Sequence, residues 1–518
     1  MSQLTFLFDP KSGMKEQSSD ELPDFFVDLN LNQVEAALFS GLEAYKLTNV
    51  FRSPLHDVRD VHFRQSLIQD LERSPVRQGV DAFLANLKRV RDCQARLAKA
   101  YYRRQKEWWL LEAIGIYATT VSELHRALTR EQHASPALGA LTEYLTEYIS
   151  GSEYTGTTKV AKDLRATLRS LRYTVLVRGL RVDVRNEVDA RDYGAEVLEV
   201  FDRFRQGEVS RYSFEFREEI EMNHVEAQIL EGVARLNRDL FDEIHGFYDA
   251  HQTFVDPTVE RFDREIQFYV AYLKYISPLK TGGLPFSYPS IESSEKESSI
   301  KEGFDLALAQ KLNNESRVPI LNDFELKAAE RILVVSGPNQ GGKTTFARMV
   351  GQVHYLAALG YQVACSSAHL ALPGRIFTHF EGEEQIQNLR GKLGDDIFRI
   401  HAILERASAD SLVLVNEMFT STSLRDAIFL SKKVADLLLA RGSNCVWVTF
   451  LDELSRIGPE TVSMTSMVNE HDTAERTFKV IRRPADGHAY AMSIAEKYHL
   501  TFDNILERMH DESTSSVS

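Results

Sequence analysis

The residues best suited to chemistry lie in one octapeptide, Gly337-Pro338-Asn339-Gln340-Gly341-Gly342-Lys343-Thr344. It fits the pattern G-x-x-x-x-G-K-[ST], in which glycines leave backbone N–H groups free to point at a polyphosphate. Lys343 can then reach the outer phosphates, and the Thr344 hydroxyl can ligate Mg²⁺. The pattern predicts a site for ATP with Mg²⁺, with Lys343 also taking part in catalysis. The residues predicted to hold the nucleotide are Gly337, Pro338, Asn339, Gln340, Gly341, Gly342, Lys343, Thr344 and Thr345.

The segments on either side of the loop favour this prediction. An apolar run over 332–335 has the composition of a strand that enters the loop, and residues 345–359 fit a helix that leaves it. The phosphates would then lie at a helix N-terminus, where N–H groups and the helix dipole favour negative charge. The alternative is a glycine-rich turn that fits the pattern by chance.

A phosphate-binding loop needs a partner strand that holds Mg²⁺ and places the attacking water. The apolar run 411–415 is predicted to be that strand, and it ends in Asn416-Glu417. Asn416 can offer an acceptor oxygen on the metal side, so Thr344 and Asn416 are the candidate metal ligands. Glu417 is the candidate catalytic group, because a carboxylate there can orient or deprotonate water. A purely structural carboxylate is the alternative.

Another apolar run, 445–449, is predicted to be a third strand, and it leads into Asp452 and Glu453. The carboxyl ends of strands in an open α/β sheet face the ligand crevice, so both acids could approach the site. Capping of the following helix is the alternative role for them.

These segments resemble the ATPase domain of the MutS family of DNA mismatch-repair proteins. The resemblance is carried by the phosphate loop, by Asn416-Glu417-Met418-Phe419-Thr420-Ser421-Thr422-Ser423, by the strand ending Val448-Thr449-Phe450, and by Arg375-Ile376-Phe377-Thr378. It covers roughly 304–509 and implies an ATPase that binds DNA as a homodimer. Asn416 stands where the family has an aspartate, and Phe450 stands where it has a histidine near the γ-phosphate.

The preceding half of the chain resembles the family's lever and DNA-clamp domains in its organisation. Helical spacing is predicted over 57–132 and again from 195 to about 276, on either side of an alternating, strand-like stretch around Gly179. Too few residues stand ahead of this region for the family's mismatch-reading and connector domains. The resemblance therefore implies a shortened form without autonomous mismatch reading.

A basic stretch lies at the predicted clamp, although the whole chain has a net charge of −14. Its cations are Lys159, Lys162, Arg165, Arg169, Arg172, Arg178, Arg181 and Arg185. Local patches rather than the overall charge govern binding to phosphates, so Arg172, Arg178 and Arg181 are candidate DNA contacts. A solvated, charged helix face is the alternative.

The whole chain of 518 residues is long enough for several domains. Three isolated cysteines indicate reduced thiols, and neither a secretion signal nor a membrane-spanning run is apparent, so we expect a cytoplasmic protein. The expected fold is multidomain, with an all-α lever/core region that carries a small β-containing clamp insertion, followed by an α/β P-loop ATPase domain of the ABC type. The expected boundaries are a disordered N-terminus (1–25), the helical core/lever (26–280, insertion near 171–235), a linker (281–303), the ATPase domain (304–509) and a disordered tail (510–518).

The leading functional hypothesis is a MutS-like ATPase that closes as an ATP-gated dimeric clamp on duplex or branched DNA, in repair or recombination. The alternative is an ATP-gated scaffold that acts on a ribonucleoprotein or a protein partner. A nucleotide kinase fits poorly, because two long helical stretches precede the phosphate loop.

Overall fold

The computed structural model describes residues 4–13, 21–131, 133–179, 181–186, 222–292, 297–381, 391–469 and 476–484. The chain divides into two compact units, one of residues 1–4 and 70–263 and the other of residues 5–69 and 264–518. We call them the helical unit and, after the phosphate loop predicted in its sequence, the nucleotide unit. The boundaries fall inside two helices, α4 (Val58–Glu72) and α12 (Pro257–Thr281). Among the helices in these ranges, none is long and apolar enough to cross a membrane.

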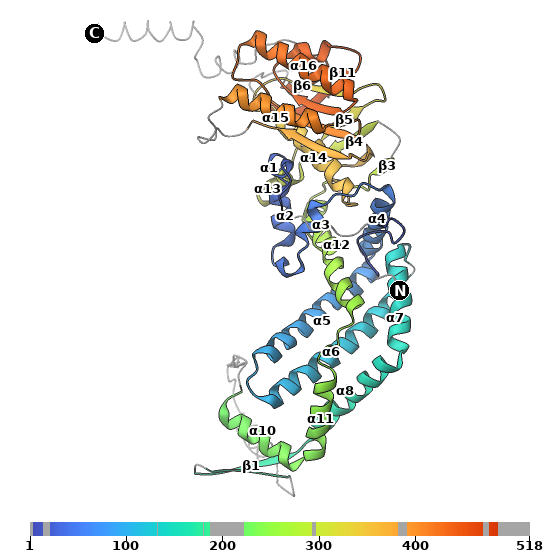
Figure 1. Cartoon of the computed structure of the whole chain (residues 1–518), viewed down its shortest axis with the longest axis vertical. Helices are drawn as coiled ribbons and strands as arrows, with labels where there is room; N and C mark the ends of the chain where they lie inside the picture. The colour runs from blue at the N-terminus through green and yellow to red at the C-terminus, as the bar shows by residue number, and fades with distance from the viewer. Residues whose placement is uncertain are drawn as a thin grey trace, which may run out of the picture. The chain divides into compact units, whose positions relative to one another are not determined.

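The helical unit begins with a pair of long helices, α5 (Ser74–Lys99) and α6 (Arg103–Arg130), followed by α7 (Pro136–Ser150) and α8 (Ser152–Ser170) (Figure 1). In α5 the buried apolar residues Val76, Val80, Phe83, Leu87 and Val90 recur every three or four positions, which places them on one face. The predicted helical region over 57–132 is therefore confirmed in α4, α5 and α6.

A hairpin of β1 (Tyr173–Arg178) and β2 (Arg181–Asn186) follows α8. Gly179 turns the chain between them with a φ of +62°, a conformation that glycine adopts at little cost. The predicted strand-rich segment with a turn near Gly179 is thus confirmed. The expected helical spacing from 195 begins outside the described residues, and α10 (His224–Leu236) and α11 (Arg238–Ala250) continue the unit.

The nucleotide unit contains, in its described part, a six-stranded sheet in the order β12-β11-β6-β10-β9-β8. Its strands are β6 (Ile332–Ser336), β8 (Arg375–His379), β9 (Ser411–Asn416), β10 (Asn444–Val448), β11 (Thr461–Val468) and β12 (Arg476–Arg482). They run parallel except for β12, which pairs antiparallel with β11 at one edge. The three strands predicted from their apolar runs, β6, β9 and β10, are adjacent in this sheet.

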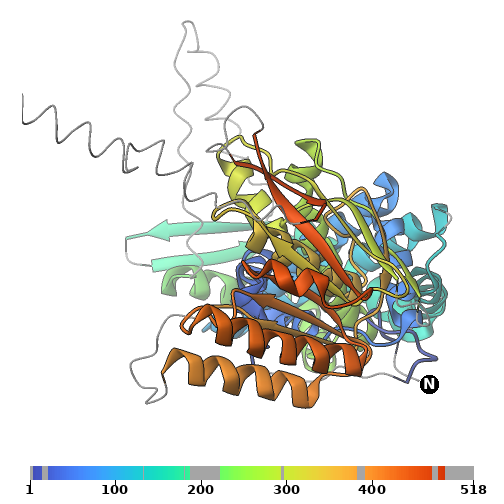
Figure 2. The ribbon, with the colours of Figure 1, turned by 90° about the horizontal axis from the view of Figure 1, so that it is seen from above.

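Helices cover both faces of this sheet. Figure 2 shows α15 (Lys392–Arg406) and α16 (Leu424–Arg441) side by side, and both supply apolar residues to one core with Val413, Val415 and Trp447 of the strands. α14 (Lys343–Ala358) lies on the other face, where a Cβ added at Gly351 would come within 2.6 Å of Leu414. A short 3-10 helix, η2 (Asp452–Arg456), follows β10.

A second sheet corrects the expectation of a linker over 281–303. This sheet has four strands among the described residues, in the order β3-β7-β4-β5. They are β3 (Ser290–Glu292), β4 (Ser298–Gly303), β5 (Asn322–Leu326) and β7 (Ser367–Ala371), with α13 (Leu306–Asn314) between β4 and β5. Ile291 and Ile300 are buried in it, although the stretch is otherwise mostly polar.

The N-terminal region also departs from expectation. We expected disorder over 1–25, yet Phe6, Leu7 and Phe8 are buried in the nucleotide unit. The short helices α1 (Phe25–Asp28), α2 (Leu31–Phe39), η1 (Glu43–Tyr45) and α3 (Thr48–Arg52) belong to the same unit. The region 26–280 is therefore not one helical domain, because its first and last segments pack with the α/β half. The tail expected to be disordered, 510–518, lies outside the described residues.

Candidate nucleotide and nucleic-acid sites

The phosphate loop connects β6 to α14, as its sequence predicted. Gly342 precedes the first turn of α14 with a φ of +89°, and Gly337 has a φ of +117°. A Cβ added at Gly341 would lie 2.3 Å from Oγ of Ser466 on β11, and one added at Gly337 would lie 2.9 Å from the Ser466 carbonyl oxygen. The glycines are therefore required both for the backbone path and for the close approach of β11.

The Lys343 side chain is buried beneath the backbone of the phosphate loop. Its Nζ donates to the carbonyl oxygens of Gly337 at 2.7 Å and Pro338 at 3.1 Å, and it lies 4.2 Å from the centre of the Phe450 ring. Burial lowers the pKa of Lys343 to about 8, an effect that the nearby Glu417 carboxylate opposes. The amine thus lies at the centre of the loop, between two carbonyl oxygens and the Phe450 ring.

Thr344 and Asn416 are brought together as predicted. The Thr344 hydroxyl donates to Oδ1 of Asn416 at 3.0 Å, so two uncharged oxygen atoms lie beside the loop. No group of three or more His, Cys, Asp or Glu side chains in the described ranges could hold a metal by itself. This donor set fits Mg²⁺, which is commonly held by few protein oxygens together with waters and substrate phosphates.

Glu417 follows directly after β9 and faces the same space. Its backbone N–H donates to the carbonyl oxygen of Val448 on β10 at 2.9 Å, and its φ is +56°. Burial raises the pKa of the Glu417 carboxyl, while Lys343 acts in the opposite direction. A carboxylate with this environment is suited to accept a hydrogen bond or a proton from water. Asp452 and Glu453, by contrast, do not line the cavity described next.

A cavity of about 490 Å³ opens beside the loop. Of the predicted residues it is lined by Asn339, Gln340, Gly341, Gly342, Lys343, Thr344, Thr345 and Glu417. Gly337, Pro338 and Asn416 stand behind this lining and act through their contacts with Lys343 and Thr344. The structure therefore gathers all the predicted nucleotide and metal residues at one place.

The opposite wall of the cavity was not predicted. It comprises Asp305, Leu308, Leu312, Arg317, Val318, Pro319, Ile320, Asn322 and Phe478. Phe478 has a φ of +56° and remains about half exposed. Asn322 holds it from both sides, since its Oδ1 accepts from the Val480 N–H at 2.8 Å and its Nδ2 donates to the Phe478 carbonyl at 3.2 Å. No local motif marks these residues, because they meet only when β5 and β12 come together.

The candidate DNA contacts lie on the β1–β2 hairpin and at its base. Arg172, Arg178 and Arg181 are all exposed, whereas Arg165 donates to Glu112 at 2.7 Å and is partly buried. Arg178 and Arg181 are register partners at the end of the hairpin. Arg181 also donates to Asp183 of its own strand at 3.1 Å. Two like charges directly opposite each other destabilise a strand pair, so Arg178 is the cation of this pair that is best placed to meet an anion.

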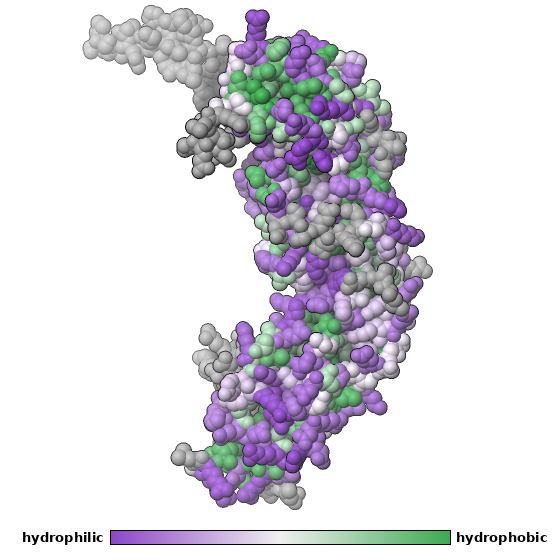
Figure 3. All heavy atoms as spheres, in the orientation of Figure 1, coloured by the Kyte–Doolittle hydropathy of each residue, from purple (hydrophilic) through white to green (hydrophobic). Residues whose placement is uncertain are grey.

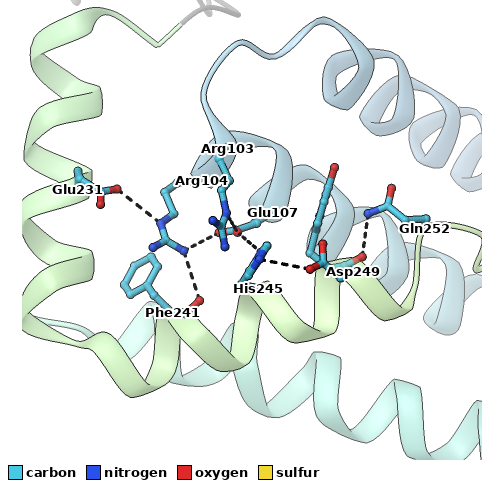
Figure 4. Close-up of polar contacts among 9 residues, drawn as sticks. Arg103, Arg104, Glu107, Glu231, Phe241, His245, Asp249 and Gln252 are labelled. Atoms are coloured by element: carbon cyan, nitrogen blue, oxygen red, sulfur yellow. Dashed lines mark hydrogen bonds and ion pairs between the residues drawn. The ribbon is translucent and has the colours of Figure 1, made fainter.

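Two other arginines of the helical unit have a structural role (Figure 4). Glu107 on α6 is almost fully buried and accepts from Arg103 and Arg104, each at 2.9 Å, with His245 of α11 at 3.1 Å. Arg104 also lies 3.7 Å from Glu231 of α10. This network ties α6, α10 and α11 together, and Arg103 and Arg104 are therefore not counted among the candidate DNA contacts.

A surface of apolar residues lies over α15 and α16 (Figure 3). The exposed apolar side chains of these helices are Ile397, Phe398, Leu424, Phe429 and Leu437. Exposed apolar side chains gathered in this way commonly mark an interface.

Comparison with known proteins agrees with the geometry of the loop. The model of the family MutS domain V matches residues 333–513. The chain is 30% identical over 191 residues to the endonuclease MutS2 of Thermus thermophilus, covering 36% of this chain and 25% of that protein. It is 24% identical over 298 residues to the DNA mismatch repair protein MutS of Thermotoga maritima, covering 56% of this chain and 36% of that one. The matched parts thus span about a quarter to a third of these relatives. Residues 333–513 thus match MutS domain V, and the similarity to MutS2 and MutS proteins covers only part of this chain and of those relatives.

Proposed function

We propose that the chain binds ATP with Mg²⁺ at this loop and hydrolyses it. The observation that carries the proposal is the convergence of three groups on one cavity: the buried Lys343 amine, the Thr344–Asn416 oxygen pair and the Glu417 carboxylate. N–H groups at a helix N-terminus, together with a lysine, attract phosphates. The Glu417 carboxylate, just after β9, is suited to place the attacking water.

Each residue then has a defined part. Lys343 would leave its loop carbonyls to balance the charge on the outer phosphates, while Thr344 and Asn416 would hold Mg²⁺ and its waters. The Mg²⁺, when bound, supplies positive charge to the phosphates. Glu417 would accept a hydrogen bond from the attacking water and take up its proton. The apolar wall around Ile320 and Phe478 suits the nucleobase, because aromatic and aliphatic surfaces favour a flat ring.

We further propose that the chain acts on duplex or branched DNA as an ATP-gated dimer, in repair or recombination, without autonomous mismatch reading. The relatives named for mismatch repair and the exposed arginines of the β1–β2 hairpin support the DNA part. A second copy of the chain is the proposed partner of the apolar surface on α15 and α16. ATP would shift the balance between open and closed states to the extent that it binds them differently.

The alternative function is an ATP-gated scaffold for a ribonucleoprotein or protein partner, and the net charge of −14 favours it. A chain that is acidic overall depends on local patches for DNA, whereas a scaffold does not need them.

The test is ATP turnover by the purified chain, with Glu417→Gln as control, with and without duplex and branched DNA at two salt concentrations. We expect turnover that DNA raises and that Glu417→Gln lowers to a small residual rate, with a DNA effect that weakens as salt increases. Turnover that is indifferent to every DNA would favour the scaffold. Equal turnover by both proteins would remove Glu417 from the mechanism.

A further inference from the structure

The turn after β9 has an unusual backbone. Glu417 and Phe419 both have left-handed φ angles, +56° and +62°, on either side of Met418. Side chains larger than glycine adopt this conformation rarely, and it persists only where neighbouring groups hold it. The direction of the Glu417 carboxylate therefore depends on whatever fixes this turn.

Two hydrogen bonds fix it, one at each left-handed residue. The Glu417 N–H donates to the Val448 carbonyl at 2.9 Å, which belongs to the neighbouring strand. The Phe419 N–H donates to Oδ2 of Asp396 at 3.2 Å, and Asp396 belongs to the separate helix α15. Phe419 and Asp396 are both largely buried, so water is poorly placed to replace the carboxylate as acceptor.

A buried histidine stands behind Asp396. His379 ends β8, is 1% exposed, and has its Nε2 3.4 Å from Oδ1 of Asp396 without the geometry of a hydrogen bond. Within the described residues neither ring nitrogen has a hydrogen-bond partner. Burial, together with the nearby Arg399 guanidinium, lowers the pKa of His379, while the Asp396 carboxylate acts in the opposite direction. The ring lies beside Oδ1 of Asp396, and Oδ2 accepts from the Phe419 N–H.

We propose that Asp396, which packs against His379, sets the direction of the Glu417 carboxylate through the Phe419 peptide. This inference rests on the proposed ATPase function. It makes α15 the element that determines whether the water-orienting group is aimed at the nucleotide. Asp396 is a positioning residue, not a catalytic one, because it contacts the turn and His379 and does not line the cavity.

The packing of α15 does not require this carboxylate. Ile400, Ile403 and Leu404 anchor the helix in the core of the nucleotide unit. Asp395, one residue earlier, already supplies an acidic residue in the first turn. The effect of losing the Asp396 oxygen should therefore appear in turnover rather than in folding.

The experiment compares two nearly isosteric variants of the full chain, Asp396→Leu and Asp396→Asn, since only asparagine keeps an oxygen for the Phe419 N–H. We expect Asp396→Leu to lower kcat by about 10- to 100-fold while ATP affinity changes less than about twofold, because a misplaced catalytic group affects the chemical step. Asp396→Asn should retain most of the turnover. Asp396→Ala replaces the leucine variant if that variant does not fold.

A second comparison tests whether Asp396 acts through Glu417. Combined with Glu417→Gln, Asp396→Leu should have little further effect, because the group that it positions is already gone. Wild-type turnover by Asp396→Leu, equal losses in both Asp396 variants, or a full further loss in the double variant would overturn the inference. Absence of turnover in the wild-type chain would instead overturn the proposed ATPase function.

Discussion

At the scale of single residues, Lys343 is the most informative group, because its environment differs so much from water. Its amine is enclosed by two loop carbonyls and the Phe450 ring, and burial lowers its pKa to about 8. Phosphates favour the charged amine. A lysine that is neutral at high pH must then take up a proton when ATP binds.

This coupling gives a pH prediction. ATP affinity should be nearly constant below pH 8 and should fall as the pH rises above it, approaching about tenfold per pH unit. Titration calorimetry or fluorescence titration with Mg²⁺-ATP across pH 7.5 to 10 would measure it, since the phosphates of that complex keep one ionisation state over this range. Lys343→Arg is the matched control, because an arginine stays charged and should remove the dependence. An equally steep fall in that variant would assign the effect to another group.

Asn416 gives a second prediction at this scale. The carboxylate of an Asn416→Asp variant would keep the acceptor for the Thr344 hydroxyl and add a negative charge at the proposed metal side. The Mg²⁺ concentration that gives half-maximal turnover should therefore decrease, by about three- to tenfold, because charge count tunes such sites. A Mg²⁺ titration of turnover is the measurement, with Asn416→Ala expected to change in the opposite direction. A large loss of activity in Asn416→Asp would mean that the amide has another role.

The residue scale also shows what the sequence could and could not predict. Thr344 belongs to the phosphate loop, and Asn416-Glu417 ends an apolar run. Both are short motifs whose chemistry demands those residue types, so the sequence alone predicts them. Phe478, Asn322 and Asp396 carry no such signal, because each acquires its role from a contact between elements that are distant in sequence.

At the scale of elements, the β1–β2 hairpin has the clearest predicted consequence. Charge reversal by Arg172→Glu, Arg178→Glu and Arg181→Glu should weaken DNA binding and flatten its salt dependence, by about 0.9 in log–log slope for each phosphate that the protein no longer neutralises. Binding isotherms at several salt concentrations would measure both. Arg126→Glu, an exposed arginine of α6 outside the basic stretch, is the control. Unchanged slopes in the triple variant would place the DNA path elsewhere.

The packing of elements also explains why the expected linker over 281–303 was wrong. Residues 281–303 lack the periodicity of a long strand, and two short strands with one buried isoleucine each were enough to build half of a sheet. The hairpin, by contrast, was predictable because strict alternation around a glycine is a local pattern.

At the scale of the whole molecule, the chain is organised as one unit inserted into another. Residues 5–69 belong with 264–518, and their contacts are specific. The Tyr355 hydroxyl donates to the Phe51 carbonyl, Gln352 donates to the Leu29 carbonyl at 2.8 Å, and Arg64 donates to Leu7 and Leu359. The nucleotide unit is therefore incomplete without the N-terminal segment.

This organisation predicts that a fragment of residues 304–518 will not fold by itself, although it contains the whole match to MutS domain V. Without residues 5–69 it would expose the surface of α14 that now contacts Leu29 and Phe51. Soluble yield and thermal unfolding of the fragment, compared with the full chain, would test this. A soluble fragment with one cooperative transition would show that the N-terminal segment is dispensable.

The inserted arrangement has a consequence for how the protein is made. On the ribosome, Leu29 emerges more than 300 residues before Gly351, the glycine that it packs against in the nucleotide unit. At typical rates of synthesis this delay lasts on the order of tens of seconds, during which Phe26 and Phe51 lack Tyr355 of α14, the ring that both contact in the folded unit. Residues 70–263 are complete long before then and can fold first. In the nascent chain the helical unit can thus be folded while the apolar N-terminal segment still lacks its partners from the nucleotide unit. Intermediates with exposed apolar segments of this kind are bound by chaperones.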